Sequence, residues 1–215
     1  KYMTPIGIVE DNDALRKTVA LLLESGNNYR VVLSERSCNK IIEKLADTMP
    51  QLLLMDIDMP GITGIEGVKI IKEHFPDVKI VMHTVFEDDS RIFDSICAGA
   101  DGYLLKNIET HFLLDGIRKA MEGDSILSPE MTTKLISQLR NPTPVKSNDT
   151  LKTLTLREKE TLYWLAKGAS NKMIAREMNV AESTVKVHVQ NILRKLELNS
   201  RVQAAVFSVE HGLDK

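Results

Sequence analysis

The sequence predicts an α/β domain built on a five-stranded, parallel, doubly wound sheet, followed by a small all-helical domain. Short apolar runs alternate with longer amphipathic stretches between Pro5 and Met121, which is typical of repeated βα units. Residues 140–150 are rich in proline and small polar residues, as expected of a linker. Beyond them, four helical patterns follow one another closely without a convincing strand. The chain should therefore fold as two domains.

Five apolar runs are predicted to form the strands of the first domain. They are apolar nearly throughout, because a parallel sheet is covered by helices on both faces. The runs are residues 6–9, 29–33, 52–55, 79–82 and 102–105. Their order in the sheet cannot be read from periodicity.

Helical periodicity occurs between the strands and again in the second half of the chain. The first domain shows it at residues 14–23, 64–75, 91–98 and 112–121, with Pro76 and Gly99 ending two of these helices. A further amphipathic stretch spans residues 129–139. The second domain shows it at residues 156–167, 171–178, 183–196 and 200–211. We therefore expect a first domain at 1–125, a helix and linker at 126–153, and a second domain at 154–215.

Charge and cysteine content narrow the class of protein. The 215 residues carry a net charge of −2, yet from Leu151 onward 11 Lys and Arg face 7 Asp and Glu, against 17 and 23 before it. A basic second domain indicates a polyanionic partner. Cys38 and Cys97 are too few for a disulfide framework, and we expect both to be buried. Neither a membrane-spanning run nor a secretion signal is evident, so we expect a soluble, cytoplasmic protein.

Acidic side chains follow two of the predicted strands. Glu10 and Asp11 come after the first strand and Asp56 after the third, so all three should meet at the carboxyl edge of the sheet. Clustered carboxylates repel unless a cation lies among them, and oxygen ligands suit Mg²⁺. Thr84 and Lys106 end the fourth and fifth strands and add a hydroxyl and a cation. Such a set can bind and stabilise a phosphoryl group.

These residues, in this order, resemble the receiver domain of two-component response regulators. The resemblance covers about residues 4–125 and is carried by Glu10-Asp11, Asp56 with Met59-Pro60-Gly61, Thr84, and Gly102-Tyr103-Leu104-Leu105-Lys106. It implies a flavodoxin-like or CheY-like fold. It also implies that a histidine kinase phosphorylates Asp56.

The same resemblance assigns a role to each residue of the site. Mg²⁺ would be held by Asp11, Asp56 and the main-chain carbonyl of Asp58, with Glu10 assisting through water. Lys106 would pair with the phosphoryl group, while Thr84 and Tyr103 would move in response to it and carry the signal.

Two other interpretations of this domain fit the sequence less well. Asp56-Ile57-Asp58 fits the Asp-x-Asp of haloacid-dehalogenase-like phosphatases, but that motif normally ends the first strand, whereas here it ends the third. A non-phosphorylated receiver on a constitutive DNA-binding protein is disfavoured by the intact carboxylate set. His83 lies beside Thr84 without a histidine or acidic partner in the pattern, and we interpret it as structural.

The second domain carries helix-turn-helix spacing. Thr155 and Glu158 form a capping box at the start of its first helix, and Gly168 ends that helix. A short helix, a turn at residues 179–182 and a longer helix from about Ser183 follow. On the longer helix a buried stripe and an exposed side are predicted. The stripe comprises Val185, Val189, Ile192 and Leu196, and the exposed side Lys186, Gln190 and Arg194.

Residues 154–206 closely resemble LuxR/NarL-type helix-turn-helix domains. The matching segments are Gly168-Ala-Ser-Asn-Lys172, Ile174-Ala175, Thr184-Val-Lys-Val-His188, Lys195-Leu196 and Asn199-Ser-Arg-Val-Gln-Ala204. The resemblance implies that Lys186 and Val187 meet bases. It places Thr184, His188, Asn171, Lys172 and Lys195 near phosphates. Gln190 either reads an adenine or faces solvent.

The whole chain is thus identified as resembling NarL/FixJ-type response regulators, which are transcription factors and not enzymes. Phosphorylation of Asp56 would control dimerisation, release of the domains from each other, or both, and through them binding to double-stranded DNA. The final helix either pairs two DNA-binding domains in a homodimer or packs against its own domain.

Overall fold

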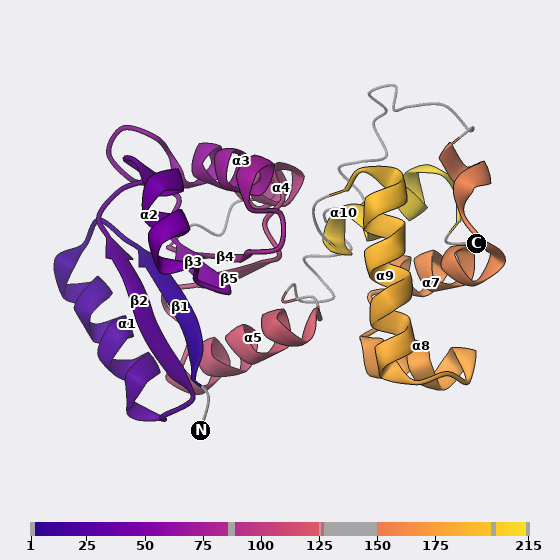
Figure 1. The fold of residues 1–215 in the computed structure, drawn as a ribbon, viewed down its shortest axis with the longest axis horizontal. Coiled ribbons are helices and arrows are strands. Elements are labelled where there is room, and N and C mark those ends of the chain that lie inside the picture. The colour runs from indigo at the N-terminus through magenta and orange to yellow at the C-terminus, as the bar shows by residue number, and fades with distance from the viewer. Residues whose placement is uncertain (1–2, 86–88, 125, 127–149, 199–200, 214–215) are drawn as a thin grey trace. The chain divides into compact units, whose positions relative to one another are not determined.

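The computed structural model describes residues 3–85, 89–124, 126, 150–198 and 201–213. The chain separates into two compact units, residues 1–122 and 123–215, which are considered one at a time (Figure 1). The helix predicted at 129–139 and nearly all of the predicted linker lie outside the described residues.

The first unit contains the predicted five-stranded parallel sheet. Its strand order is β2-β1-β3-β4-β5, with a register irregularity in β1 between Ile6 and Gly7. The strands are β1 (Thr4–Val9), β2 (Tyr29–Glu35), β3 (Leu52–Met55), β4 (Lys79–Thr84) and β5 (Gly102–Leu105). The prediction of five parallel strands is confirmed.

Helices cover both faces of this sheet. Figure 1 shows α1 and α5 on one side and α2, α3 and α4 on the other, so the sheet is doubly wound. Their bounds are α1 (Asp13–Ser25), α2 (Ile41–Thr48), α3 (Gly64–His74), α4 (Asp89–Ala98) and α5 (Thr110–Glu122). The Asn12 side chain caps α1 and a Thr63–Glu66 capping box starts α3. The periodicity did not locate α2, which has only eight residues.

The core of the first unit lies between the sheet and its helices. All four residues of β3 are at most 1% exposed, which explains their uniformly apolar character. Cys38 is buried as expected, but Cys97 is exposed and the prediction for it was wrong. Ile92 and Ile96 lie on the buried face of α4, and the helical period turns Cys97 away from that face.

The second unit is helical in its described residues. It comprises a 3₁₀ turn η1 (Thr150–Thr153), α7 (Leu156–Ala166), α8 (Asn171–Met178), α9 (Glu182–Leu196) and α10 (Arg201–Glu210). The capping box at the start of α7 is present as predicted. Asn179 ends α8 with φ 52°, a left-handed conformation that asparagine tolerates, and so makes the turn into α9.

One apolar cluster holds the helices of the second unit together. The predicted stripe on α9 is buried, with Val185 and Ile192 at 0% exposure. From α10, Ala204, Ala205 and Phe207 join the same cluster, so that much of this helix packs on its own domain. In the described part of the chain no helix has the length and apolar character needed to cross a bilayer.

Candidate functional site

The pairing of the strands brings the predicted site residues to one edge. Val9 of β1 is in register with Met55 of β3. The ladder continues past the strand ends, since the Asp56 N–H donates to the Val9 carbonyl at 2.9 Å. Likewise the Lys106 N–H donates to the Thr84 carbonyl at 2.8 Å. The residues after four parallel strands are therefore held side by side, as the sequence predicted.

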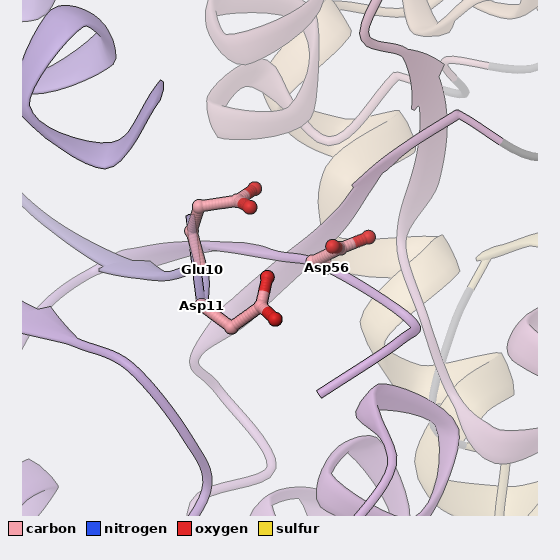
Figure 2. Close-up of side chains that lie close together, drawn as sticks. All are labelled: Glu10, Asp11 and Asp56. Carbon is pink, nitrogen blue, oxygen red and sulfur yellow. The ribbon is translucent and has the colours of Figure 1, made fainter. Parts of the chain in front are cut away.

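Three carboxylates converge at this edge, as Figure 2 shows. Glu10, Asp11 and Asp56 each offer an oxygen, and the three oxygens lie within 4.8 Å of one another. Glu10 and Asp56 are buried, at 3% and 5% exposure, whereas Asp11 is exposed. Oxygen ligands with one side open to water fit Mg²⁺, which usually keeps several of its waters.

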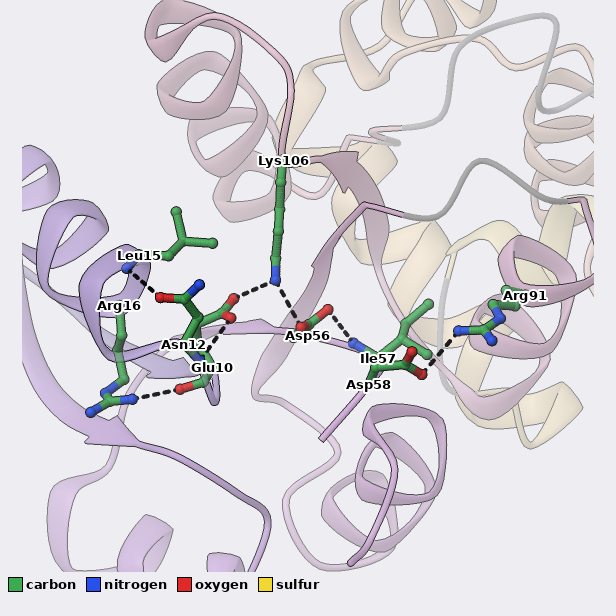
Figure 3. Close-up of polar contacts among 9 residues, drawn as sticks. All are labelled: Glu10, Asn12, Leu15, Arg16, Asp56, Ile57, Asp58, Arg91 and Lys106. Atoms are coloured by element: carbon green, nitrogen blue, oxygen red, sulfur yellow. Dashed lines mark hydrogen bonds and ion pairs between the residues drawn. The ribbon is translucent and has the colours of Figure 1, made fainter. Parts of the chain in front are cut away.

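Lys106 is the cation that balances the two buried carboxylates. Its Nζ lies 2.7 Å from Asp56 Oδ2 and 2.7 Å from Glu10 Oε2 (Figure 3). Burial raises the pKa of Glu10 even though the hydrogen bond from Lys106 opposes it. Burial by itself would lower the pKa of Lys106, but the hydrogen bonds to Asp56 and Glu10 outweigh it and the pKa is raised. The lysine thus stays charged between its two acids.

Main-chain groups and the side chain of Arg16 hold the acidic residues in place. Asp56 Oδ1 accepts a 2.7 Å hydrogen bond from the Ile57 N–H, and Glu10 Oε1 accepts one of 3.2 Å from the Asn12 N–H. Arg16 Nη1 donates to the Glu10 carbonyl at 2.7 Å. Sequence reasoning missed Arg16, whose only signal is its position one turn into the helix that follows the acidic pair.

An ion pair across the site was also missed. Arg91 of α4 reaches Asp58 in the loop after β3, with 3.0 Å between Nη1 and Oδ1 (Figure 3). Both side chains are substantially exposed, at 36% and 60%. The residues are 33 positions apart, so no local pattern could have connected them.

Two predicted switch residues lie inside the domain. Thr84 is 0% exposed, and no group of the described residues hydrogen-bonds to its hydroxyl. A buried hydroxyl without a hydrogen bond lowers the stability of the fold by about 1–3 kcal/mol. The Thr84 hydroxyl can therefore donate a hydrogen bond to an oxygen that enters the site. Tyr103 is 2% exposed. His83 is buried, and burial lowers its pKa to about 4, so that it is neutral at pH 7.

A glycine shapes the loop that follows Asp56. The Gly64 N–H donates to the Ile57 carbonyl at 2.8 Å, which draws the start of α3 close to the end of β3. A Cβ on Gly64 would lie 1.9 Å from the Asp56 carbonyl oxygen. The close approach explains why only glycine fits here.

The predicted DNA-reading residues on α9 lie on one exposed side. Lys186, Val187 and Gln190 are exposed, Val187 at 52%, while Thr184 and His188 are half-buried. Lys172, in the first turn of α8, is also exposed. An exposed apolar Val187 among polar neighbours is suited to contact with a base edge.

Two other predicted phosphate contacts are engaged within the domain. Asn171 is 4% exposed, and its Oδ1 accepts a hydrogen bond of 2.6 Å from Arg201 Nη1. Lys195 Nζ lies 2.7 Å from Oε2 of Glu158, which is 3% exposed. Burial would raise the pKa of Glu158, but hydrogen bonds from Lys195 and Thr155 lower it. These side chains position the helices of the domain.

The comparisons with known proteins agree with the geometry of both domains. Residues 6–118 match the family model for the response regulator receiver domain. Residues 152–208 match that for bacterial regulatory proteins of the luxR family. The transcriptional regulatory protein LnrK of Bacillus subtilis is 36% identical, covering 98% of this chain and 99% of that protein. The response regulator protein VraR of Staphylococcus aureus is 34% identical, covering 95% and 96%.

Solved structures resemble the chain along its whole length. The response regulator ChrA of a heme-sensing two-component system is 26% identical, covers 98% of both chains and superposes with a TM-score of 0.52. A response regulator RcsB in complex with DNA, at 22% identity and a TM-score of 0.57, covers 97% of this chain and 99% of that one and shares the fold. The chain belongs to the response regulators that join a receiver domain to a LuxR-type DNA-binding domain, a family of transcriptional regulators and not of enzymes.

Proposed function

We propose that Asp56 is the phosphoacceptor and that its phosphorylation controls binding of the chain to double-stranded DNA. The observation that supports this best is the arrangement around Asp56. The buried Asp56 carboxylate lies 2.7 Å from Lys106 Nζ and next to the carboxylates of Glu10 and Asp11. At the same edge of the sheet the Thr84 hydroxyl has no partner among the described residues. In the proposed reaction an Asp56 oxygen attacks the phosphorus of a kinase phosphohistidine, the P–N bond breaks, and an acyl phosphate forms.

The residues around Asp56 would each serve this transfer. Asp11, Asp56 and the main-chain carbonyl of Asp58 would hold Mg²⁺, with Glu10 assisting through water. When bound, the ion neutralises charge on the transferring phosphoryl group. Lys106 would turn from Glu10 toward the new phosphoryl oxygens.

The signal would then pass through the two buried switch residues. The Thr84 hydroxyl would donate a hydrogen bond to the phosphoryl group, and Tyr103 would change rotamer in the space that Thr84 leaves. This shifts the receiver toward a second state that favours dimerisation, release of the DNA-binding domain, or both. The chain would then act as a homodimer on a two-fold symmetric site.

In the second domain, α9 would enter the major groove as the recognition helix. Lys186 and Val187 would contact bases, with Gln190 next to them. Lys172, Thr184 and His188 would contact phosphates. Asn171 and Lys195 would act near the backbone chiefly by holding α8 and α9 in position, given their partners Arg201 and Glu158. With a histidine kinase and DNA as its partners, the protein would act in the cytoplasm.

Light scattering and DNA binding together test this proposal. Molar mass and affinity for a duplex are measured with Mg²⁺, before and after adding beryllofluoride, for wild type and Asp56→Asn. We expect affinity to rise in the wild type alone, with a shift to dimer if dimerisation is the route. Intact mass after acetyl phosphate reports phosphate uptake. Uptake without a change in DNA affinity, or an equal response in Asp56→Asn, would overturn the proposal.

A further inference from the structure

Asp124, two residues after the end of α5, places its carboxylate at the start of α8. Residues 123–124 belong to the second unit, and Asp124 Oδ1 accepts a 3.0 Å hydrogen bond from the Asn171 N–H. Asn171 is the first residue of α8, whose N-cap is Ser170. Unpaired N–H groups and the helix dipole make this end of a helix favourable for an anion. In this structure the anion is part of the chain itself.

A buried arginine completes the anion site. Arg201 Nη1 lies 3.7 Å from Asp124 Oδ1, and the arginine side chain is only 10% exposed. The guanidinium also donates to the carbonyl of Gly123 at 2.9 Å and to the carbonyl of Ala169. Burial lowers the pKa of Arg201 to about 10, while Asp124 opposes that shift, so the group stays charged at pH 7. The Asp124 side chain is 21% exposed, so one side of the ion pair faces solvent.

The same helix end belongs to the proposed DNA surface. Lys172, the next residue of α8, is exposed, and α8 packs against α9, which carries the proposed base contacts. A DNA phosphate is a tetrahedral oxyanion that helix N-termini and arginines bind through the same groups that now hold Asp124. A carboxylate and a phosphate cannot occupy one N–H together. Asp124 therefore stands where a phosphate contact of the complex would form.

The place of Asp124 in the chain connects this site to the receiver. Glu122 is the last residue of α5, and Gly123 follows it with φ +80°, a conformation suited to glycine at a helix end. α5 packs against β4 and β5. β4 ends at Thr84, and Lys106, the residue after β5, lies 2.7 Å from Asp56. Asp124 is thus two residues from a helix that rests on the switch strands.

We propose that Asp124 is an internal competitor of DNA phosphate, held at the start of α8 in the unphosphorylated chain and withdrawn when phosphorylation shifts α5. The inference rests on the proposed function, because it takes phosphorylation as the event that moves the receiver. The contact of Asp124 with the start of α8 would keep the resting chain from binding DNA phosphate there.

Salt-dependent DNA binding by the full-length chain tests the competitor. Asp124→Asn keeps an oxygen acceptor but removes the charge, and Glu177→Gln removes one charge from the exposed far end of the same helix. The probe is a fluorescent duplex of arbitrary sequence, measured without phosphodonor over a range of salt. We expect Asp124→Asn to bind about tenfold tighter than wild type. Its plot of log affinity against log salt should be steeper by about 0.9, the contribution of one more phosphate.

The control and the phosphodonor arm separate the possible failures. If Glu177→Gln matches Asp124→Asn in affinity and slope, only net charge matters and the inference is overturned. Beryllofluoride should raise wild-type affinity strongly and Asp124→Asn affinity much less. If beryllofluoride leaves the wild type unchanged, the proposed function fails, while the unphosphorylated comparison still decides whether Asp124 competes.

Hydrogen exchange supplies a readout that needs no variant. The Asn171 amide donates to Asp124, so it should be protected in the resting chain and should exchange faster after beryllofluoride is added. Unchanged protection at Asn171, together with a rise in DNA affinity, would show that phosphorylation acts by another contact and would overturn the inference.

Discussion

Gly64→Ala should slow the phosphorylation of Asp56, because the added Cβ displaces the main chain of that residue. The added Cβ would lie 1.9 Å from the Asp56 carbonyl oxygen and 2.9 Å from Ile57 Cα, whereas real Cβ atoms essentially never come closer than 3.0 Å. The nearest obstacle is backbone and not a flexible side chain, so the loop or the helix must move by about an ångström. Such overpacking costs about 1–3 kcal/mol of stability. A shift of about 1 Å in a reacting group lowers the rate about a hundredfold.

Gly67→Ala is the matched control for this prediction. It lies one turn further along α3 and is equally buried, but its Cβ would meet Cys38 Sγ at 2.6 Å, away from the acidic site. Urea unfolding should show both variants destabilised. Phosphorylation by acetyl phosphate, followed by intact mass, should be slowed about a hundredfold in Gly64→Ala alone. A wild-type rate in Gly64→Ala would refute the idea that this glycine sets the position of Asp56.

Three further outcomes follow from charged and buried groups. Lys106→Met should lower the free energy of unfolding by about 3 kcal/mol in EDTA, because Glu10 and Asp56 lose their cation. Mg²⁺ should restore part of this loss by neutralising the same carboxylates, and an equal loss in EDTA and in Mg²⁺, measured by urea unfolding, would contradict the prediction. Lys195→Met should lower stability by about 1–3 kcal/mol by leaving Glu158 buried and unpaired, and adding Glu158→Gln should restore much of it in thermal unfolding. Burial lowers the pKa of His83 to about 4 from 6.5, so the stability held by its neutral form is complete above pH 6.5 and falls as the pH drops toward 4. When the pH falls from 7 to 4.5, the free energy of unfolding should therefore decrease by about 2–3 kcal/mol less in His83→Gln than in wild type, as measured by denaturant unfolding.

The acidic site was predictable because parallel strands share a direction. The apolar runs predict parallel strands, which places Glu10 and Asp56 at the same carboxyl edge. The pairing of β1 with β3, which periodicity does not give, brings the two residues together. Periodicity likewise located the buried stripe of α9, from Val185 to Leu196. It did not locate α2, whereas α8, which has the same eight residues, was found through the spacing of the helix-turn-helix motif. The number of cysteines did not distinguish the buried Cys38 from the exposed Cys97, because it does not show on which side of α4 Cys97 falls.

Other contacts between distant residues, outside the acidic site, could not be predicted from the sequence. Lys195 is 37 residues from Glu158, and Arg201 is 78 residues from Gly123. The motif indicated that Asn171 and Lys195 matter for DNA binding, but not that other side chains already hold them. A basic residue in a nucleic-acid-binding motif has two possible partners, a phosphate or an acid of its own domain. Only burial of that acid, as for Glu158 at 3% exposure, separates the two.

Both proposed sites for phosphate share one physical feature, a cation that other groups of the chain hold in place beside a carboxylate. Lys106 is held by Glu10 and Asp56, and Arg201 lies beside Asp124. A long cationic side chain loses about 2 kcal/mol of rotamer freedom when it is fixed, and here that cost falls on folding instead of on phosphate binding. Phosphate can bind at such a site only if it binds more tightly than the carboxylate that it replaces. At Lys106 a covalent phosphoryl group on Asp56 meets this condition, since it adds charge to the existing partner. At Arg201 a DNA phosphate competes with Asp124 without that help, so binding there should depend on the receiver to withdraw the acid.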